Sequence, residues 1–199
     1  MHYMTESAIS LREQKKVETA HRITLAAQLL TEQHGLDGFT MEELAEAADV
    51  SRRTLFNYFA SKTDAVLGPE PEVPEADVDA FRSGGPHGTL IEDLAELARS
   101  ALSTKQLDRT TVERARRLLT GEPRLLAAAH HRFETVTEEF TGLVLEREGA
   151  GFDPARARLL LRLVLSLFDG ALDDFLADGD RTLVEAFDKQ LAAARELLA

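Results

Sequence analysis

Helical periodicity recurs along nearly the whole of this 199-residue chain and restricts its fold more than any other feature. Apolar residues fall three and four positions apart in one segment after another, as in Ile23, Ala26, Ala27 and Leu30. No sustained alternation of apolar and polar residues indicates a strand. The pattern therefore predicts an all-α fold.

Capping residues and helix breakers divide this pattern into separate helices. Thr40 and Glu43 have the spacing of a capping box, and Gly35 stands where a helix C-cap belongs. The pair Gly68-Pro69 ends a further helix, because proline cannot continue one. The predicted helices are 12–34, 41–48, 51–59, 61–67, 88–103, 108–120, 123–147, 154–178 and 181–198.

Three segments follow from these breaks. Residues 1–67 are predicted to form a three-helix, helix-turn-helix DNA-binding domain. Residues 68–87, in which prolines alternate with acidic residues, are predicted to be an irregular linker. Residues 88–199 are predicted to form a larger helical bundle for ligand sensing and dimerisation.

The helix-turn-helix prediction depends on two short helices joined by the turn Asp49-Val50-Ser51. Six apolar residues can face inward onto the first helix: Leu44, Ala45, Ala48, Val50, Leu55 and Phe59. Polar residues are left on the outer face of the second helix: Arg52, Arg53, Thr54, Asn57 and Tyr58. Arginine can read guanine, asparagine can read adenine, and hydroxyl groups can bind phosphate, so this face is predicted to contact DNA.

The charge distribution is compatible with DNA binding although the net charge is −12. Residues 50–63 contain Arg52, Arg53 and Lys62 and no acidic residue. A local basic face can bind DNA while the acidic remainder discourages non-specific binding. The alternative is an ordinary three-helix core with surface arginines.

The segment from Gly38 to Lys62 resembles the helix-turn-helix of the TetR family of transcriptional regulators. The resemblance lies in the runs G-F-T, L-A, A-D-V-S, T-L-F-N-Y-F and S-K, and the variant R-R-T-L-F-N-Y-F-x-S-K resembles an actinobacterial subset. It implies that Thr40 and Lys62 contact phosphates. Ser51 and Thr54 are also expected to contact DNA. It also implies base reading by Arg52 and Arg53, and base or backbone contacts by Asn57 and Tyr58.

Two positions depart from the family pattern. Asp49 stands where the turn often has glycine, and aspartate tolerates left-handed geometry better than most residues. Phe56 stands where tyrosine is usual, and phenylalanine cannot donate a hydrogen bond to a phosphate.

The last two predicted helices suggest a homodimer. Segment 154–178 is apolar around most of its circumference and must be covered on several sides, whereas 181–198 has a single apolar stripe. The resemblance also implies dimerisation through the last two helices. The expected interface residues are Leu172, Phe175, Leu183, Phe187 and Leu191; the alternative is that both helices close the core of one chain.

A ligand pocket is predicted in the same region. Helix 154–178 has a narrow polar stripe that includes Arg162, Ser166 and Asp169, and His130 and Phe133 lie on helix 123–147. These five residues are expected to line a cavity for a small-molecule effector. The competing reading makes the stripe a solvated or interface edge and His130 an ordinary boundary residue.

Several function classes are excluded or lack support. The absence of cysteine excludes disulfides and thiolate sites. No metal motif, phosphate loop or catalytic constellation supports an enzyme or a cofactor. No apolar segment reaches the ~20 residues of a membrane span, so a cytoplasmic location is expected.

These observations predict a ligand-responsive regulator, a repressor that leaves a palindromic operator in double-stranded DNA when a small hydrophobic or acyl-type effector binds. The alternative is a ligand-independent regulator that acts through a protein partner. A ligand-sized internal cavity would separate the two.

Overall fold

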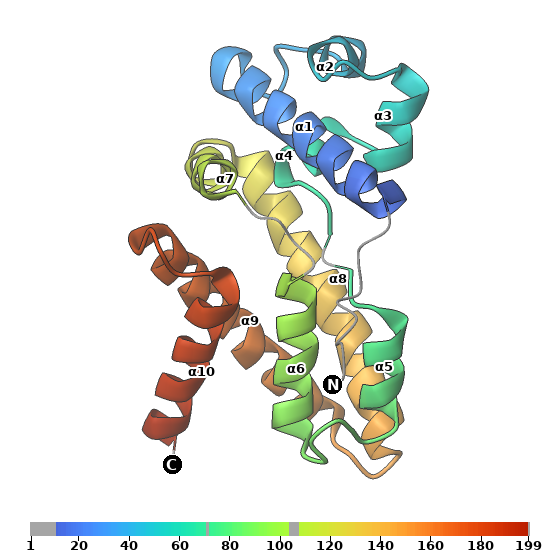
Figure 1. Ribbon diagram of the computed structural model, residues 1–199, viewed down its shortest axis with the longest axis vertical. Coiled ribbons are helices and arrows are strands. Elements are labelled where there is room, and N and C mark those ends of the chain that lie inside the picture. Colours follow the sequence, from blue (N-terminus) through green and yellow to red (C-terminus); the bar gives the residue numbers. More distant parts are fainter. Residues whose placement is uncertain (1–10, 71, 104–107, 199) are drawn as a thin grey trace, which may run out of the picture. The chain divides into compact units, whose positions relative to one another are not determined.

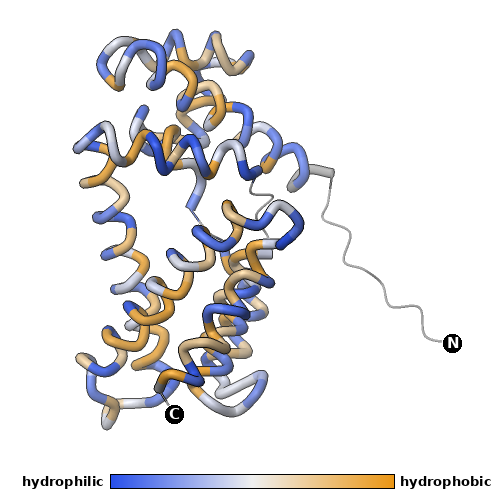
Figure 2. The backbone as a smooth tube through the Cα atoms, turned by 90° about the vertical axis from the view of Figure 1, so that its left-hand side faces the viewer, coloured by the Kyte–Doolittle hydropathy of each residue, from blue (hydrophilic) through white to orange (hydrophobic). Residues whose placement is uncertain are grey.

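The computed structural model describes residues 11–70, 72–103 and 108–198, and all regular structure within these ranges is helical (Figure 1). The predicted all-α fold is confirmed. Hydrophobic and hydrophilic residues alternate along most helices, as amphipathic packing requires (Figure 2). Within the described ranges, no helix combines the length and apolarity that a membrane span needs.

The chain divides into two compact units. Unit 1 contains the described residues up to Pro69 together with Glu113–Ala128. Unit 2 contains Glu70–Val112 and the described residues from Ala129 onward.

Four helices form most of unit 1: α1 (Leu11–His34), α2 (Met41–Ala47), α3 (Arg52–Tyr58) and α4 (Lys62–Leu67). One face of α1 packs on the other three, with Ile23 and Ala27 fully buried. Leu44 of α2, Leu55 of α3 and Ala65 of α4 complete this core, and each is 0% exposed. Gln28 of α1 also donates to the carbonyl oxygen of Val66 at 3.0 Å, which fixes α4 against α1.

Unit 1 extends beyond the predicted boundary at residue 67. It includes the second half of α7 (Arg109–Gly121) and the first turns of α8 (Pro123–Glu148). Leu125 is 0% exposed within the same core. Glu32 pairs with Arg114 at 2.9 Å and with Arg117 at 3.1 Å, and Asp37 accepts two hydrogen bonds from Arg124. We call these pairs the arginine clamp.

Unit 2 is built from α5 (Glu75–Arg82), α6 (Leu90–Ser103), the remaining parts of α7 and α8, α9 (Pro154–Ala177) and α10 (Leu183–Leu198). Helix α5 lies inside the segment that was predicted to be irregular, and for residues 75–82 that prediction is wrong. Phe81 is 0% exposed in the core of unit 2, so the apolar face of α5 gains enough burial to order a short, acid-rich segment.

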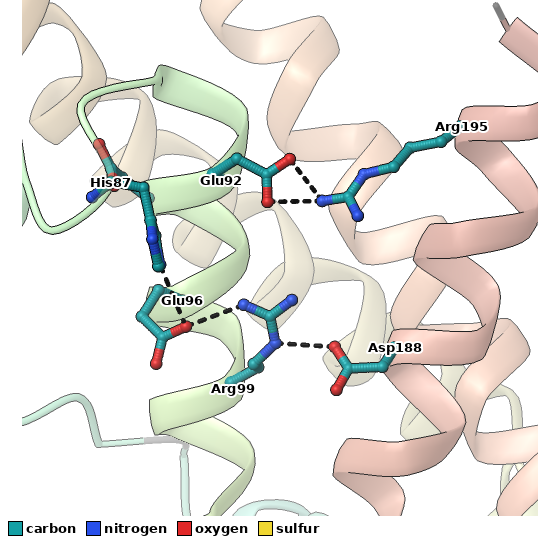
Figure 3. A network of polar contacts seen from close by, with 7 residues as sticks. His87, Glu92, Glu96, Arg99, Asp188 and Arg195 are labelled. Carbon is teal, nitrogen blue, oxygen red and sulfur yellow. Dashed lines mark hydrogen bonds and ion pairs between the residues drawn. The ribbon is translucent and has the colours of Figure 1, made fainter.

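Charged groups join the helices of unit 2 at its surface. Arg99 of α6 donates to Asp188 of α10 at 2.7 Å and to Glu96 at 2.8 Å, and Arg195 of α10 pairs with Glu92 of α6 (Figure 3). These contacts, which are partly solvent-exposed, orient α10 along α6 and contribute little net stability individually.

A charged pair lies in the interior of unit 2. Asp93 is 0% exposed and lies 2.5 Å from Arg147, which also donates to the carbonyl oxygen of Phe81. Burial disfavours the ionised carboxyl group, but hydrogen bonds from the His87 amide and Arg147 outweigh it and hold the pKa of Asp93 below its usual value.

The residues predicted at the dimer interface lie mostly in this same core. Phe175, Leu183, Phe187 and Leu191 are at most 6% exposed, and Leu172 is half-buried. These four side chains have little area left to bury against a second chain, and the dimer interface stays a prediction. They close the core of a single chain, which was the alternative interpretation.

Candidate nucleic-acid interface

The loop that precedes α2 is held by local backbone constraints. At Gly38, a Cβ atom would lie 2.1 Å from the carbonyl oxygen of His34, so no larger residue fits there without movement. Phe39, which follows, is 4% exposed and anchors the loop in the core of unit 1. The glycine and phenylalanine of G-F-T therefore have structural roles that the sequence pattern alone did not reveal.

Helix α2 begins with the predicted capping box. Thr40 Oγ1 accepts a hydrogen bond from the Glu43 amide at 3.1 Å, and Glu43 Oε2 accepts one from the Thr40 amide at 2.7 Å. The hydrogen bond from the Thr40 backbone is the main reason that the pKa of Glu43 lies below its usual value. Thr40 is thus fixed at an exposed helix N-terminus, where unpaired amides favour anions.

The turn between α2 and α3 has the predicted geometry. Asp49 has a φ of 51°, in the left-handed region, and it is the residue that stands in place of the frequent glycine. Ser51 then caps α3, since its Oγ accepts from the Thr54 amide at 3.0 Å and lies 2.7 Å from the Thr54 hydroxyl oxygen. The hydroxyl groups of Ser51 and Thr54 therefore serve primarily in the cap.

The predicted division of the recognition helix α3 into inner and outer faces is largely confirmed. Leu55 and the C-cap residue Phe59 are buried, whereas Arg52, Arg53 and Asn57 are exposed. Thr54 and Tyr58 are half-buried at the edge of this face.

The exposed polar residues of α3 differ in what they contact. Arg52 pairs through Nε with Glu42 of α2 at 3.0 Å. Arg53 and Asn57 make no hydrogen bond or ion pair with any part of the chain that the structure describes. Their donors and acceptors are therefore available to an external partner.

Lys62 does not extend freely into solvent. Its Nζ donates to the carbonyl oxygen of Phe39 at 2.7 Å and lies 4.9 Å from the centroid of the Phe39 ring. The ammonium group therefore ties the start of α4 to the loop before α2. Because an ammonium group has three donors, two remain for a phosphate.

The residues predicted to line a ligand pocket lie on the surface of unit 2. His130 and Phe133 of α8 and Arg162, Ser166 and Asp169 of α9 are all exposed. Ser166 donates to the carbonyl oxygen of Arg162 within its own helix, and Arg162 lies 3.6 Å from Glu134. In the single chain these five side chains are exposed and do not line a closed cavity, so the ligand pocket stays a prediction.

Comparison with known proteins adds an independent line of evidence. Residues 23–67 match the family model for bacterial regulatory proteins of the tetR family. These residues comprise the second half of α1 and all of α2, α3 and α4. Residues 23–67 are a tetR-family helix-turn-helix domain.

Two curated proteins that match most of this chain are named as transcriptional regulators. TcmR, an HTH-type transcriptional regulator of Streptomyces glaucescens, is 26% identical over 155 residues, which cover 75% of this chain and 69% of TcmR. MftR of Mycobacterium tuberculosis (strain ATCC 25618 / H37Rv), a transcriptional regulator named for mycofactocin biosynthesis, is 25% identical over 173 residues. That match covers 86% of this chain and 87% of MftR.

A solved structure is also similar. It is the crystal structure of a TetR-family transcriptional regulator from Mesorhizobium loti MAFF303099. The alignment covers 92% of this chain and 96% of that protein's chain, at 19% identity and a TM-score of 0.46. The family match rests on residues 23–67, and the subset suggested by the R-R-T-L-F-N-Y-F-x-S-K variant stays a prediction.

Proposed function

We propose that this chain is a DNA-binding transcriptional regulator that contacts a palindromic operator through α3 of its tetR domain. The observation that carries the proposal is the pair of exposed side chains on the capped helix α3, Arg53 and Asn57, which have no partner among the residues that the structure describes. Base reading requires such free groups, because arginine binds guanine and asparagine binds adenine through two hydrogen bonds each.

Selection of bound fragments from a random DNA library, followed by quantitative binding at fixed salt, tests the proposal. We expect Arg53→Ala to lose roughly 10- to 100-fold affinity per half-site for the selected operator and to relax the preference at one base pair. Arg158→Ala is the matched control, since Arg158 is an exposed arginine of α9. No enrichment of any sequence by the unmodified protein would refute the proposal.

The proposal includes a homodimer, because a palindromic operator requires two-fold symmetry. Helix α9 exposes two leucines one turn apart, Leu159 at 59% and Leu163 at 46%. Together they replace the predicted interface residues as the apolar surface that a second copy would cover. The small exposed residues Ala192 and Ala193 of α10 allow close approach of another helix.

We further propose that an effector bound to unit 2 weakens operator binding. The arginine clamp supports a route for this coupling, since within unit 1 it fastens α7 to α1 and the start of α8 to the loop that follows α1. Both helices also contribute residues to unit 2, so a shift of either helix would reach the tetR domain. The assignment of a small hydrophobic or acyl-type effector depends on the resemblance alone.

A further inference from the structure

The recognition helix carries one large apolar side chain on its outer face. Phe56 is 45% exposed, whereas Phe39 and Phe59 of the same unit are at most 4% exposed. Phe56 lies between the exposed residues Arg52 and Asn57, on the face that the proposed function directs toward the major groove. Its ring has no hydroxyl group and can offer a partner only an apolar or aromatic contact.

Phe56 and Arg52 form a single unit on this face. They are four residues apart on α3, and the Arg52 guanidinium carbon lies 5.5 Å from the centroid of the Phe56 ring. On its other side, Arg52 Nε is held by Glu42 at 3.0 Å. The two terminal nitrogens of Arg52 bind no acceptor in the described part of the chain, so the fork that recognises guanine remains free.

An apolar group on a major-groove helix distinguishes one base from the others. Thymine is the base that presents a methyl group in the major groove, and apolar side chains such as phenylalanine read it by direct contact. Phe56 lies beside the guanidinium group of Arg52, which is suited to bind guanine. A methyl group in contact with Phe56 would therefore belong to a base next to that guanine.

We propose that Phe56 is a specificity-determining residue that contacts the 5-methyl group of a thymine adjacent to the guanine bound by Arg52. This inference rests on the proposed DNA-binding function and deepens it by naming the chemical group that is read. Glu42 acts as a positioning residue, because it directs Arg52 along the Phe56 ring.

The test replaces thymines of the selected operator one at a time by 2′-deoxyuridine, which keeps the base pair and removes only the methyl group. For the unmodified protein we expect one position per half-site at which this change weakens binding about fourfold, the value for one buried methyl group. Substitution in both half-sites of a dimer should then cost about 15-fold.

Phe56→Ala should bind both forms of this operator equally, so that the thymine-to-uracil ratio of affinities falls to about one. Asn57→Ala is the matched control: it should bind the operator more weakly but keep the same ratio, because it leaves Phe56 in place. Both residues are exposed, so circular dichroism should show both variants folded.

Two results would overturn the inference while leaving DNA binding intact. One is an operator in which no methyl removal changes the affinity of the unmodified protein. The other is a methyl dependence that persists in Phe56→Ala, which would assign the contact to another residue. Failure of the unmodified protein to select any DNA sequence would instead refute the proposed function itself.

Discussion

Lys62 combines a structural contact with the contact to DNA that we propose. Its hydrogen bond to the Phe39 carbonyl and its position over the Phe39 ring fix the spacing between the start of α4 and the N-terminus of α2. A cation held against a carbonyl oxygen at the edge of a DNA-binding face adds positive charge without the mobility of an extended lysine. Substitution should therefore affect both folding and binding.

Lys62→Ala is expected to lower the free energy of unfolding by ~1–3 kcal/mol, because it removes a charged hydrogen bond and a cation–π contact. It should also flatten the plot of log affinity against log salt concentration by about 1 per half-site, near 2 for a dimer. Urea unfolding and binding titrations at several salt concentrations measure the two effects. Arg158→Ala should change neither; an unchanged salt slope for Lys62→Ala would limit Lys62 to its structural role.

At the residue scale, the sequence predicted this helix-turn-helix well because each of its features is local. A capping box and a left-handed turn residue each need only neighbours within a few positions. Thr40, Asp49 and Ser51 all adopt the predicted geometry. The contact from Lys62 to Phe39 spans 23 residues and carries no such signal.

At the scale of single elements, the turn between α2 and α3 stores a small amount of strain. Left-handed geometry costs a residue with a Cβ atom roughly 1–2 kcal/mol, and aspartate adopts it more readily than most. Asp49→Gly should relieve this strain but increase the entropy of the unfolded chain, so we expect stability within about 0.5 kcal/mol of the original.

Asp49→Val should increase the strain in the same turn. A β-branched side chain at a φ of 51° should lower the free energy of unfolding by ~1–3 kcal/mol, measured by urea unfolding. Equal stability of the valine and glycine variants would show that the turn changes its conformation on substitution.

The arginine clamp should make the stability of unit 1 depend on pH. Arg124 holds the pKa of Asp37 below its ordinary value of 3.8. At Glu32, burial acts in the opposite sense, but hydrogen bonds from Arg117 and Arg114 outweigh it and lower the pKa from 4.5. A carboxyl group with a lowered pKa contributes stability that is present above its ordinary pKa and is lost as the pH falls through the lowered value.

Glu32→Gln should therefore lower the urea midpoint at pH 7, by the equivalent of roughly 1 kcal/mol or less. The difference from the unmodified chain should shrink as the pH falls below about 4.5. Glu46→Gln, which alters an exposed carboxylate of α2, is the control and should show no such convergence. A constant difference at all pH values would mean that Glu32 acts through packing instead of charge.

The prediction of helices was wrong where a segment is ordered by packing against distant parts of the chain. The acidic segment 75–82, which follows a proline-containing stretch, was predicted to be a linker, yet Phe81 enters the core of unit 2 and orders α5. The predicted pocket meets a related limit: helical periodicity identifies which residues share a face, but not whether that face meets another helix or solvent.

At the scale of the whole molecule, the same limit applies to the predicted dimer interface. The apolar stripe of α10 and the nearly all-apolar α9 were compatible with either a core or an interface. Phe187 packs within the chain, whereas Leu159 and Leu163 of α9 remain exposed. The sequence predicted that α9 needs covering on more than one side; it could not say which leucines the chain covers by itself.

Two substitutions by aspartate separate these roles. Leu163→Asp should leave the fold intact, since Leu163 is 46% exposed, but should yield monomers, because association would trap a carboxylate against apolar surface at a cost of several kcal/mol. Phe187→Asp should instead unfold unit 2, because Phe187 is 0% exposed and an unpaired charge in the core is costlier still. Sedimentation velocity reports the mass, and thermal unfolding by circular dichroism reports the fold.

Ile91→Asp is the matched control for these variants, because Ile91 is an exposed apolar residue of α6, at 39%, outside the proposed interface. It should sediment and melt like the unmodified protein. Because the proposed dimer would bind its operator through both copies of α3, Leu163→Asp should also lose specific binding while each monomer keeps an intact tetR domain. A Leu163→Asp protein that sediments as a dimer and binds the operator fully would place the two-fold axis on another surface.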